Sequence, residues 1–498
     1  MSNERNDTTT FPDPVYKDTV LAALFEGVKA HYARHMGTIN KAHLVMLAET
    51  GILTADQTGP LARALIEIEE ETDLDALTYT GEHEDYFFLV ESELKRKLGD
   101  LGGMLHTARS RNDMDHTLFK LALRDRVHVL WQELALLAQA IADKAETEAE
   151  TLIVAYTHGQ PAQPSTFGHY LYAALEVLMR DMARLNAAVD DLDHCPMGAA
   201  AITTSGFPID RNRISDLLGF EEPLLNSYGC IASVDYVTGL YSALKLVFVH
   251  LGRLIQDMAF WSSFEVGQLY VPNAFVQISS IMPQKRNPVP IEHMRHLAAV
   301  TASRCDAMID TMRNTPFTDM NDSEGEVQQA GYAAFDSGSR VLRLLTAFLP
   351  ACSIDQSRVS RNSDAACITI TELADTLVRD EALSFRQAHE IAARTARGVL
   401  AEADPLAKGY RHFQKAFKAE TSRDSKLDAS AFELAVAPET FVSKRNRAGG
   451  PAPEALAEAG KIYAADLDKL NRQHADRHAR HMQSTELLDA AFAVLLET

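Results

Sequence analysis

The sequence predicts a mainly α protein with a long central helix bundle, and three observations lead to this prediction. Residues 117–150 contain neither glycine nor proline, and their apolar side chains recur near the helical period of about 3.6 residues. Residues 235–264 are apolar nearly all round, as in a helix at the centre of a bundle. Glycine, proline and serine gather instead in clusters between such segments, at residues 159–165, 195–208, 271–290 and 448–453.

We expect three long helices, over residues 117–150, 235–264 and 288–313. Pro288 stands near the start of the third, where proline is tolerated because its missing N–H would have no helical partner. Helices of this length pack side by side as an elongated bundle. One chain can hardly cover helices that are apolar all round, so we also expect burial against other subunits.

The chain length and composition indicate a globular protein of several domains. Its 498 residues exceed one ordinary core, and 46% are hydrophobic while 23% are charged. We divide the chain into an N-terminal helical domain (1–105), a central helical bundle (106–355) and a C-terminal helical domain (356–498). The longest apolar run, residues 244–261, is interrupted by Lys245, His250, Arg253 and Asp257, so we expect no membrane span.

The net charge of −21 argues against a nucleic-acid partner, because the phosphate backbone would be repelled. A site for a carboxylate substrate would have to be locally basic and screened from the rest of the protein. Five cysteines lie far apart, and residues 2–10 are polar without a secretory leader, so we expect reduced thiols and a cytoplasmic location. The sequence has no metal-ligand spacing and no phosphate-binding glycine loop, so we expect neither a metal nor a cofactor.

One ten-residue segment before the third helix combines two hydroxyls, two cations and an amide. It reads Ser279-Ser280-Ile281-Met282-Pro283-Gln284-Lys285-Arg286-Asn287-Pro288. A helix N-terminus offers free N–H groups that suit a carboxylate, while Lys285 adds a point charge and Asn287 adds directional donors. Chemistry alone leaves a solvated basic turn as an equal alternative.

The order of these residues resembles the signature of the fumarase/aspartase superfamily, Gly-Ser-Ser-x-Met-Pro-x-Lys-x-Asn-Pro, with Ile278 in place of the leading glycine. Two more blocks are similar to the argininosuccinate lyase branch of that superfamily. They read His106-Thr107-Ala108-Arg109-Ser110-Arg111-Asn112-Asp113 and Thr157-His158-Gly159-Gln160-Pro161-Ala162-Gln163-Pro164. With weaker matches at both ends, the resemblance covers nearly the whole chain.

This resemblance implies a fumarase/aspartase-type fold and a homotetramer in which each active site is assembled from three subunits. It also implies a carbon–nitrogen lyase that cleaves an N-substituted aspartate, a small di- or polycarboxylate, to fumarate and an amine. The proton to be removed lies beside a carboxylate, so a second negative charge develops there and must be stabilised.

Residue roles follow from the same resemblance. Ser279 would be the base, with Ser280 as the alternative and otherwise a carboxylate ligand. Lys285 and Asn287 would stabilise the developing charge, and His158 would assist from another subunit unless it is an interface histidine. The grip on substrate carboxylates or amine would fall to Thr157, Arg111 and Asn112. We expect Arg109 to be structural, in a buried ion pair with an acid such as Asp113.

The chain departs from argininosuccinate lyases where the arginine end should bind. In the family an acidic residue near the N-terminus and a Tyr-Asn-Lys-Asp-Met-Gln-Glu-Asp-Lys stretch do this work. Alignment puts Lys29 at the acidic position, Asp319 at the Tyr and Glu324 at the Gln. The amine half has then lost its acid and gained a cation, and an unpaired charge changes which partner is accepted.

We therefore interpret the chain as resembling an ethylenediaminedisuccinate (EDDS) lyase, which acts on an aminopolycarboxylate. Lys29 would face the distal carboxylate, and Asp319 or Glu324 would meet an ammonium. The alternative is argininosuccinate lyase with a tolerant pocket. Two further readings are an inactive lens crystallin, disfavoured by the nearly intact serine segment, and a hydratase, disfavoured by the block at residues 109–113.

Overall fold

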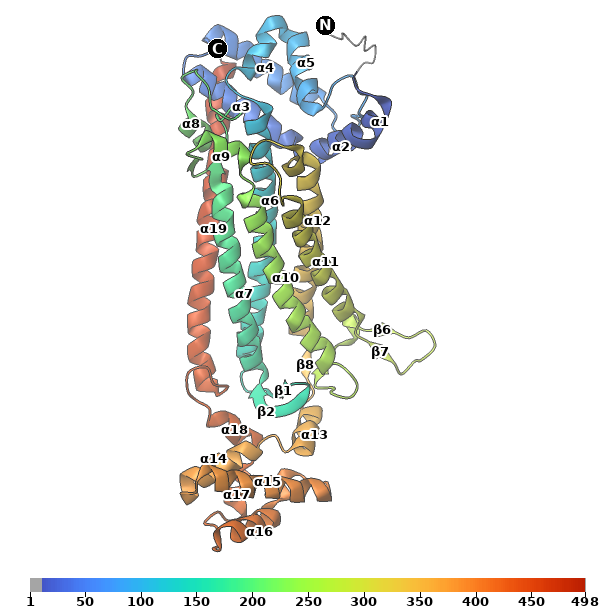
Figure 1. Ribbon diagram of the computed structural model, residues 1–498, viewed down its shortest axis with the longest axis vertical. Helices are drawn as coiled ribbons and strands as arrows, with labels where there is room; N and C mark the ends of the chain where they lie inside the picture. Colours follow the sequence, from blue (N-terminus) through green and yellow to red (C-terminus); the bar gives the residue numbers. More distant parts are fainter. Residues whose placement is uncertain (1–10, 498) are drawn as a thin grey trace, which may run out of the picture.

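The structure, a computed structural model, describes residues 11–497; residues 2–10, on which the expectation about a leader rested, lie outside this range. The molecule is elongated (Figure 1). N-terminal helices lie at one end of a long bundle and a small helical domain lies at the other end. No helix in residues 11–497 is long and apolar enough to cross a membrane.

The N-terminal end is a group of short helices around the start of the bundle. Its elements are α1 (Pro14–Tyr16), the π-helix η1 (Lys17–Leu21), α2 (Ala22–His31), α3 (Ala33–Glu49), α4 (Ala55–Glu71), α5 (Tyr86–Leu98) and the 3₁₀ helix η2 (Gly99–His106). Much of α3 is buried, as expected of a helix packed between others.

The central bundle contains α6 (Arg111–Thr147), α7 (Phe167–Asp190), α10 (Asp235–Trp261), α11 (Val289–Thr311) and α12 (Gly325–Ala351). All three long helices expected from the sequence are present, as α6, α10 and α11. The first begins six residues earlier than expected, because Ser110 and Asp113 form a capping box at its start.

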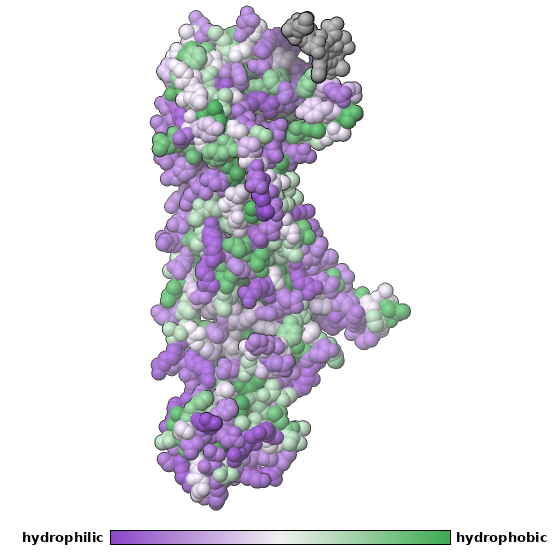
Figure 2. Space-filling view, viewed as in Figure 1, coloured by the Kyte–Doolittle hydropathy of each residue, from purple (hydrophilic) through white to green (hydrophobic). Residues whose placement is uncertain are grey.

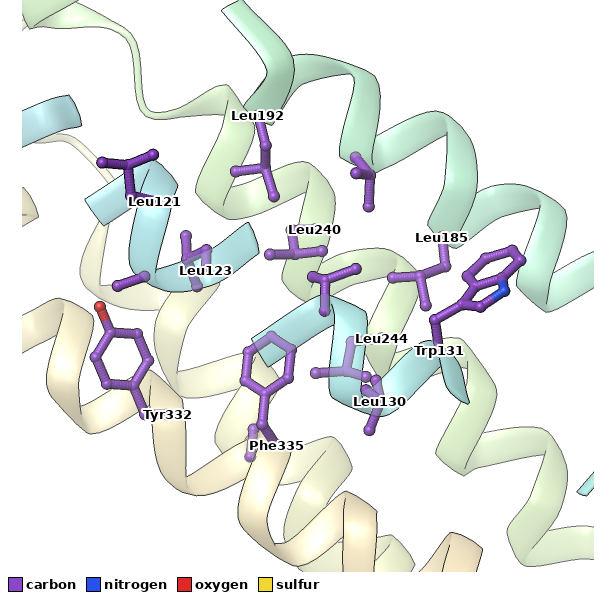
Figure 3. Packing of buried hydrophobic residues seen from close by; sticks show 14 of the residues in the cluster. Leu121, Leu123, Leu130, Trp131, Leu185, Leu192, Leu240, Leu244, Tyr332 and Phe335 are labelled. Atoms are coloured by element: carbon purple, nitrogen blue, oxygen red, sulfur yellow. The ribbon is translucent and has the colours of Figure 1, made fainter. Parts of the chain in front are cut away.

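The bundle core is close-packed leucine and aromatic side chains from α6, α7, α10 and α12 (Figure 3). Leu121 and Leu240 are buried there together with Phe335. On α12, Gly331 and Gly338 allow α10 to come close, since a Cβ at these positions would lie 2.2 Å from the Tyr241 hydroxyl and 2.5 Å from the Phe248 ring.

Short strands connect the helices, and two of the pairs carry candidate functional residues. The hairpin β1 (Leu152–Thr157) with β2 (Gln160–Thr166) ends the bundle next to the C-terminal domain, and β6 (Gln277–Ile278) with β7 (Arg286–Asn287) forms a projecting arm. We expected a loop at residues 159–165, but β2 occupies most of it. Its two prolines are tolerated because a two-stranded hairpin leaves each strand a free edge.

Smaller elements complete the middle of the chain. They are the 3₁₀ turn η3 (Asp191–Asp193), β3 (His194–Cys195), α8 (Arg211–Leu218), β4 (Glu222–Pro223), α9 (Ser227–Ala232), β5 (Leu269–Tyr270), η4 (Asn273–Phe275), η5 (Asn321–Ser323) and β8 (Ser353–Ile354). β3 pairs with β4 in parallel, and β5 pairs with β8 antiparallel.

The C-terminal part has a hydrophobic core of its own, formed by residues between 367 and 436. Its elements are α13 (Gln356–Ala366), α14 (Ile370–Glu381), α15 (Phe385–Glu402), η6 (Leu406–Lys408), α16 (Tyr410–Thr421), α17 (Ala429–Ala435) and α18 (Pro438–Ser443). The last helix, α19 (Pro453–Leu496), leaves this core and runs back along α7 and α6 to the N-terminal helices (Figure 1). The division at 105 and 355 stays a proposal, and α19 is the segment that crosses it.

Candidate active site

The start of α6 fixes two of the expected substrate-binding residues. The Ser110 hydroxyl accepts the N–H of Asn112, and the Asp113 carboxylate accepts the N–H of Ser110, which closes the capping box. Arg111 and Asn112 therefore occupy the first turn of a long helix, where free N–H groups and the positive end of the dipole lie. The Asn112 amide donates to the Ala201 carbonyl at 3.0 Å, which orients its side chain.

The expected ion pair between Arg109 and Asp113 is wrong. Arg109 is buried as predicted, but its guanidinium donates to the Asn40 side-chain oxygen at 2.8 Å. Asp113 is fully buried and accepts backbone N–H groups from Ser110, Gly198 and Ala200. A carboxylate that already accepts three N–H groups needs no partner cation, so the capping role decided the geometry.

Arg111 lies among four carboxyl groups. Its guanidinium is 2.7 Å from Asp85, 3.4 Å from Asp115 and 3.8 Å from Glu84. Asp85 starts α5, Asp115 lies one helical turn after Arg111, and the charge of Glu324 at the start of α12 also acts on Arg111. We call Arg111, Asp85, Asp115, Asp319 and Glu324 the Arg111 cluster.

The cluster holds more negative than positive charge, and this perturbs its acids. Burial, the charge of Asp115 and a hydrogen bond with Asp319 raise the pKa of Glu324 to about 8. Burial, opposed by Arg111, raises the pKa of Asp115 to about 7. One oxygen of Asp319 has no partner within residues 11–497. A partly buried site that has more carboxyl groups than cations, some of them titrating near neutral pH, is suited to a cationic group of a ligand.

Lys29 does not supply a free cation to this region. Its ammonium donates to the Leu77 carbonyl at 2.7 Å and is 2.8 Å from Glu26. The ammonium of Lys29 is therefore already paired. Sequence reasoning named Asp319 and Glu324 as acids for an ammonium but missed Asp115. A polar residue one turn after Arg111 on a buried helix was the available signal for Asp115.

The block at residues 157–164 forms the tip and return strand of the β1–β2 hairpin. Thr157 and Gln160 pair at its end, so His158 and Gly159 make a two-residue turn, and both have positive φ. This turn type needs left-handed backbone at both positions, which glycine adopts freely and histidine adopts at a cost of about 1 kcal/mol. The turn presents Thr157 and His158 on the surface of the single chain.

The serine segment lies in the β6–β7 arm between α10 and α11. The Ser279 hydroxyl oxygen accepts the N–H of Met282 at 3.0 Å and of Ile281 at 3.4 Å. Ser280 is exposed, Asn287 is partly buried, and the Lys285 ammonium has no partner within residues 11–497. The arm also exposes Ile278 (82%) and Ile281 (83%), and hydrophobic atoms mark its tip in Figure 2.

One chain does not bring the three blocks together. Arg111 and the hairpin lie at opposite ends of α6, whose 37 residues span about 55 Å. The β6–β7 arm points sideways, away from both (Figure 1). The hairpin tip and the serine arm are exposed, whereas Arg109 and Asp113 of the first block are buried.

No group of three or more His, Cys, Asp or Glu side chains in the described part of the chain is arranged to hold a metal ion. The Arg111 cluster is thus described by its hydrogen bonds and charges alone. Its residues come from the starts of α5, α6 and α12 and from the segment before η5.

Comparison with protein families gives two matches. Residues 26–302 match the lyase family, and residues 367–443 match the argininosuccinate lyase C-terminal family. Both matches include elements described above: the first spans all three blocks, and the second spans most of the separate C-terminal core.

Individual proteins point to the same relationship. Argininosuccinate lyase 2 of Agrobacterium fabrum is 57% identical over 483 residues, which is 97% of this chain and 96% of that protein. Argininosuccinate lyase of Methanothermobacter thermautotrophicus is 34% identical over 84% of this chain and 90% of its own length. Among solved structures, EDDS lyase in complex with formate has a TM-score of 0.83 at 27% identity, covering 98% of this chain and 97% of that one.

Proposed function

The chain belongs to the lyase family and is a carbon–nitrogen lyase that releases fumarate, and from this premise we propose that its second product is an amine with an additional positive charge. The observation that carries this proposal is the Arg111 cluster. Its acidic side chains, which include Asp115, Asp319 and Glu324, outnumber its single arginine. EDDS and its mono-succinyl product N-(2-aminoethyl)aspartate fit, because each has a second nitrogen that is an ammonium near neutral pH.

The fumarate half is the common part of the mechanism. Ser279 takes the proton from the carbon beside a substrate carboxylate while Lys285 and Asn287 stabilise the charge that develops. The electrons form the fumarate double bond as the carbon–nitrogen bond breaks, and the amine leaves with its electron pair and takes up a proton. Two N–H groups directed at the Ser279 oxygen support this role, because they favour its deprotonated form.

Substrate carboxylates meet the start of α6 and the hairpin in this proposal. The Asn112 side-chain nitrogen has two hydrogens, of which one is bound to Ala201, so the second is free to donate to a succinyl carboxylate. Thr157 and His158 come from another subunit, and Ser280 binds a carboxylate from the arm. In this proposal Arg111 also meets a distal carboxylate of EDDS, while Lys29 stays bound to Glu26.

The assembly that this requires is a homotetramer with sites shared among three chains. The separation of the blocks in one chain supports it, as do the exposed isoleucines of the arm. A monomer by mass in solution would contradict it. We also propose a cytoplasmic location, supported by five cysteines that are all buried free thiols.

Argininosuccinate lyase is the second candidate function. Its amine product carries a guanidinium, which the acids of the Arg111 cluster also suit, and the Agrobacterium relative bears that name. Against it stands Asp319 at the position where the family pattern has a tyrosine. The two candidates differ in the size and shape of the cation and not in its sign.

The deciding experiment runs the reaction in the direction of addition. Purified enzyme is mixed with fumarate and an equimolar mixture of ethylenediamine and arginine, and the adducts are identified by mass spectrometry. We expect N-(2-aminoethyl)aspartate first and EDDS later. Exclusive formation of argininosuccinate would overturn the proposed amine. A monoamine that lacks a second charged group and reacts as well as ethylenediamine would overturn the role of the cluster.

A further inference from the structure

Residues 477–481 of the long C-terminal helix α19 lie beside one buried acid, Asp193, before the helix continues to Leu496. This residue lies in η3 after α7 and is 1% exposed. Three cationic or hydrogen-bonding side chains of α19 converge on its two oxygens: Arg480 at 2.5 Å, Arg477 at 2.9 Å and His481 at 3.2 Å. Burial alone would raise the pKa of Asp193, but these three partners outweigh it and the pKa is lowered.

This contact anchors the beginning of a strained loop. Directly after Asp193, β3 leads into residues 196–204, where Gly198, Ala200 and Thr204 all have positive φ. Such a backbone costs about 1 kcal/mol or more at each non-glycine residue, so it persists only where neighbouring contacts fix it. A Cβ on Gly198 would lie 2.6 Å from the Arg211 side chain, so the loop is also packed closely against the start of α8.

The other side of the same loop holds the start of α6. The N–H groups of Gly198 and Ala200 each donate to Asp113 at 2.9 Å. One residue further on, the Ala201 carbonyl accepts the Asn112 amide at 3.0 Å. The loop therefore contacts both the capping acid of α6 and one of the expected substrate-binding residues.

We propose that Asp193 and the three α19 side chains that bind it are positioning residues for Asn112, acting through the loop at residues 196–204. The proposal rests on the proposed function, in which Asn112 binds a substrate carboxylate. Asp193 sets where the loop begins, the loop sets where Asp113 and the Ala201 carbonyl lie, and these two groups direct the Asn112 amide. The last helix of the chain thereby acts on substrate binding without touching the substrate.

The test compares Arg477→Gln/Arg480→Gln with Arg472→Gln, an exposed member of the same helix whose partner is Asp468. Hydrogen exchange of the peptide that contains residues 196–204 is measured by mass spectrometry, together with KM, kcat and the fumarate dissociation constant. We expect at least tenfold faster exchange and about tenfold weaker substrate and fumarate binding, with a smaller change in kcat. The control should match the wild type in all four quantities.

A double-mutant cycle separates positioning from general stability. In an Asn112→Ala background, Arg477→Gln/Arg480→Gln should change KM no further, because the group that it positions is gone. Additive effects on KM would overturn the proposal. So would a folded Arg477→Gln/Arg480→Gln enzyme with a lower melting temperature but wild-type KM and fumarate affinity.

Two arrangements keep the result interpretable. If Arg477→Gln/Arg480→Gln does not fold, Asp193→Asn and His481→Gln, which remove less charge, are measured in the same way, and wild-type KM in both overturns the proposal. An enzyme that forms neither adduct from fumarate contradicts the proposed amine alone. The fumarate dissociation constants of the variants then still decide whether α19 positions Asn112.

Discussion

The serine arm and the Arg111 cluster are built in opposite ways. The arm is exposed, it carries an unpaired lysine, and its apolar tip has no cover within the chain. The Arg111 cluster is partly buried, acidic and held by a capping box, ion pairs and a backbone network. The groups proposed to form fumarate thus lie on an exposed part, while the groups proposed to select the amine lie on a part that the chain itself preforms.

This difference indicates where amine specificity can change without loss of the elimination reaction. In the proposed function the arm serves the same proton removal whatever amine leaves. The acids of the cluster meet the amine, so an exchange of these side chains should alter the accepted partner and leave the elimination intact. The following predictions test this division, beginning with the largest expected effect.

In the serine arm, Ser279→Ala should nearly abolish turnover. Removal of a general base typically lowers the rate by about 10³-fold, and the arm is exposed, so the melting temperature should stay at the wild-type value. Fumarate formation is followed by its ultraviolet absorbance, with Ser280→Ala as the matched control and a smaller loss expected. Near-normal turnover of Ser279→Ala would contradict the role of Ser279 as the base. If Ser280→Ala alone were inactive, Ser280 would be the base instead.

Mixing two inactive variants should restore activity if the arm and the hairpin meet across subunits. Ser279→Ala and His158→Ala are unfolded together and refolded, so that hybrid tetramers form. A site that takes one residue from each of two chains is intact in about a quarter of cases for random mixing. No recovery, with hybrid tetramers verified by mass, would show that both residues belong to the same chain's site.

In the Arg111 cluster, Glu324→Gln should change how the binding of the amine depends on pH. The pKa of Glu324 is raised to about 8, so the residue is mostly neutral at pH 6 and mostly charged at pH 9. The KM of N-(2-aminoethyl)aspartate should therefore fall about tenfold as pH rises through this range, because its distal ammonium stays charged. In Glu324→Gln this fall should be reduced or lost; an unchanged slope would place the selecting charge elsewhere.

Lys29→Met should have the smallest effect. The ammonium is already bonded to Glu26 and the Leu77 carbonyl, so its removal alters the KM of EDDS by less than about threefold. The KM of N-(2-aminoethyl)aspartate, which has no distal carboxylates, is the control. A large rise in the KM of EDDS alone would restore Lys29 as a ligand of the distal carboxylates.

Much of the fold was predictable from periodicity. The three long helices follow from apolar spacing, and their ends lie within a few residues of those expected, except at Ser110, whose capping box starts α6 earlier. Strand β2 was not predictable, because Pro161 and Pro164 indicate a loop unless the strand lies at a free edge. The return of α19 was not predictable either, since its amphipathic pattern fits packing on any apolar face.

The candidate site divides in the same manner. Motif order identified Ser279, His158 and Arg111, because an ordered run of residues with defined chemistry is carried by the sequence itself. Sequence reasoning missed two acids beside Arg111: Asp85 is distant in sequence and only folding brings it close, whereas Asp115 lies one helical turn after Arg111. The partner of Arg109 was misjudged for a related reason: the nearest acid in sequence, Asp113, was already satisfied by backbone N–H groups.

Local periodicity and motifs read in order were enough to predict the helical class and the fumarate-releasing chemistry, and the residues proposed to carry that chemistry follow from the same motifs. Folding was needed to show that acids surround Arg111, that Lys29 is paired with Glu26, and that α19 reaches Asp193. Electrostatic energy depends on the distance between charges and on their burial, and neither quantity is contained in the order of the residues.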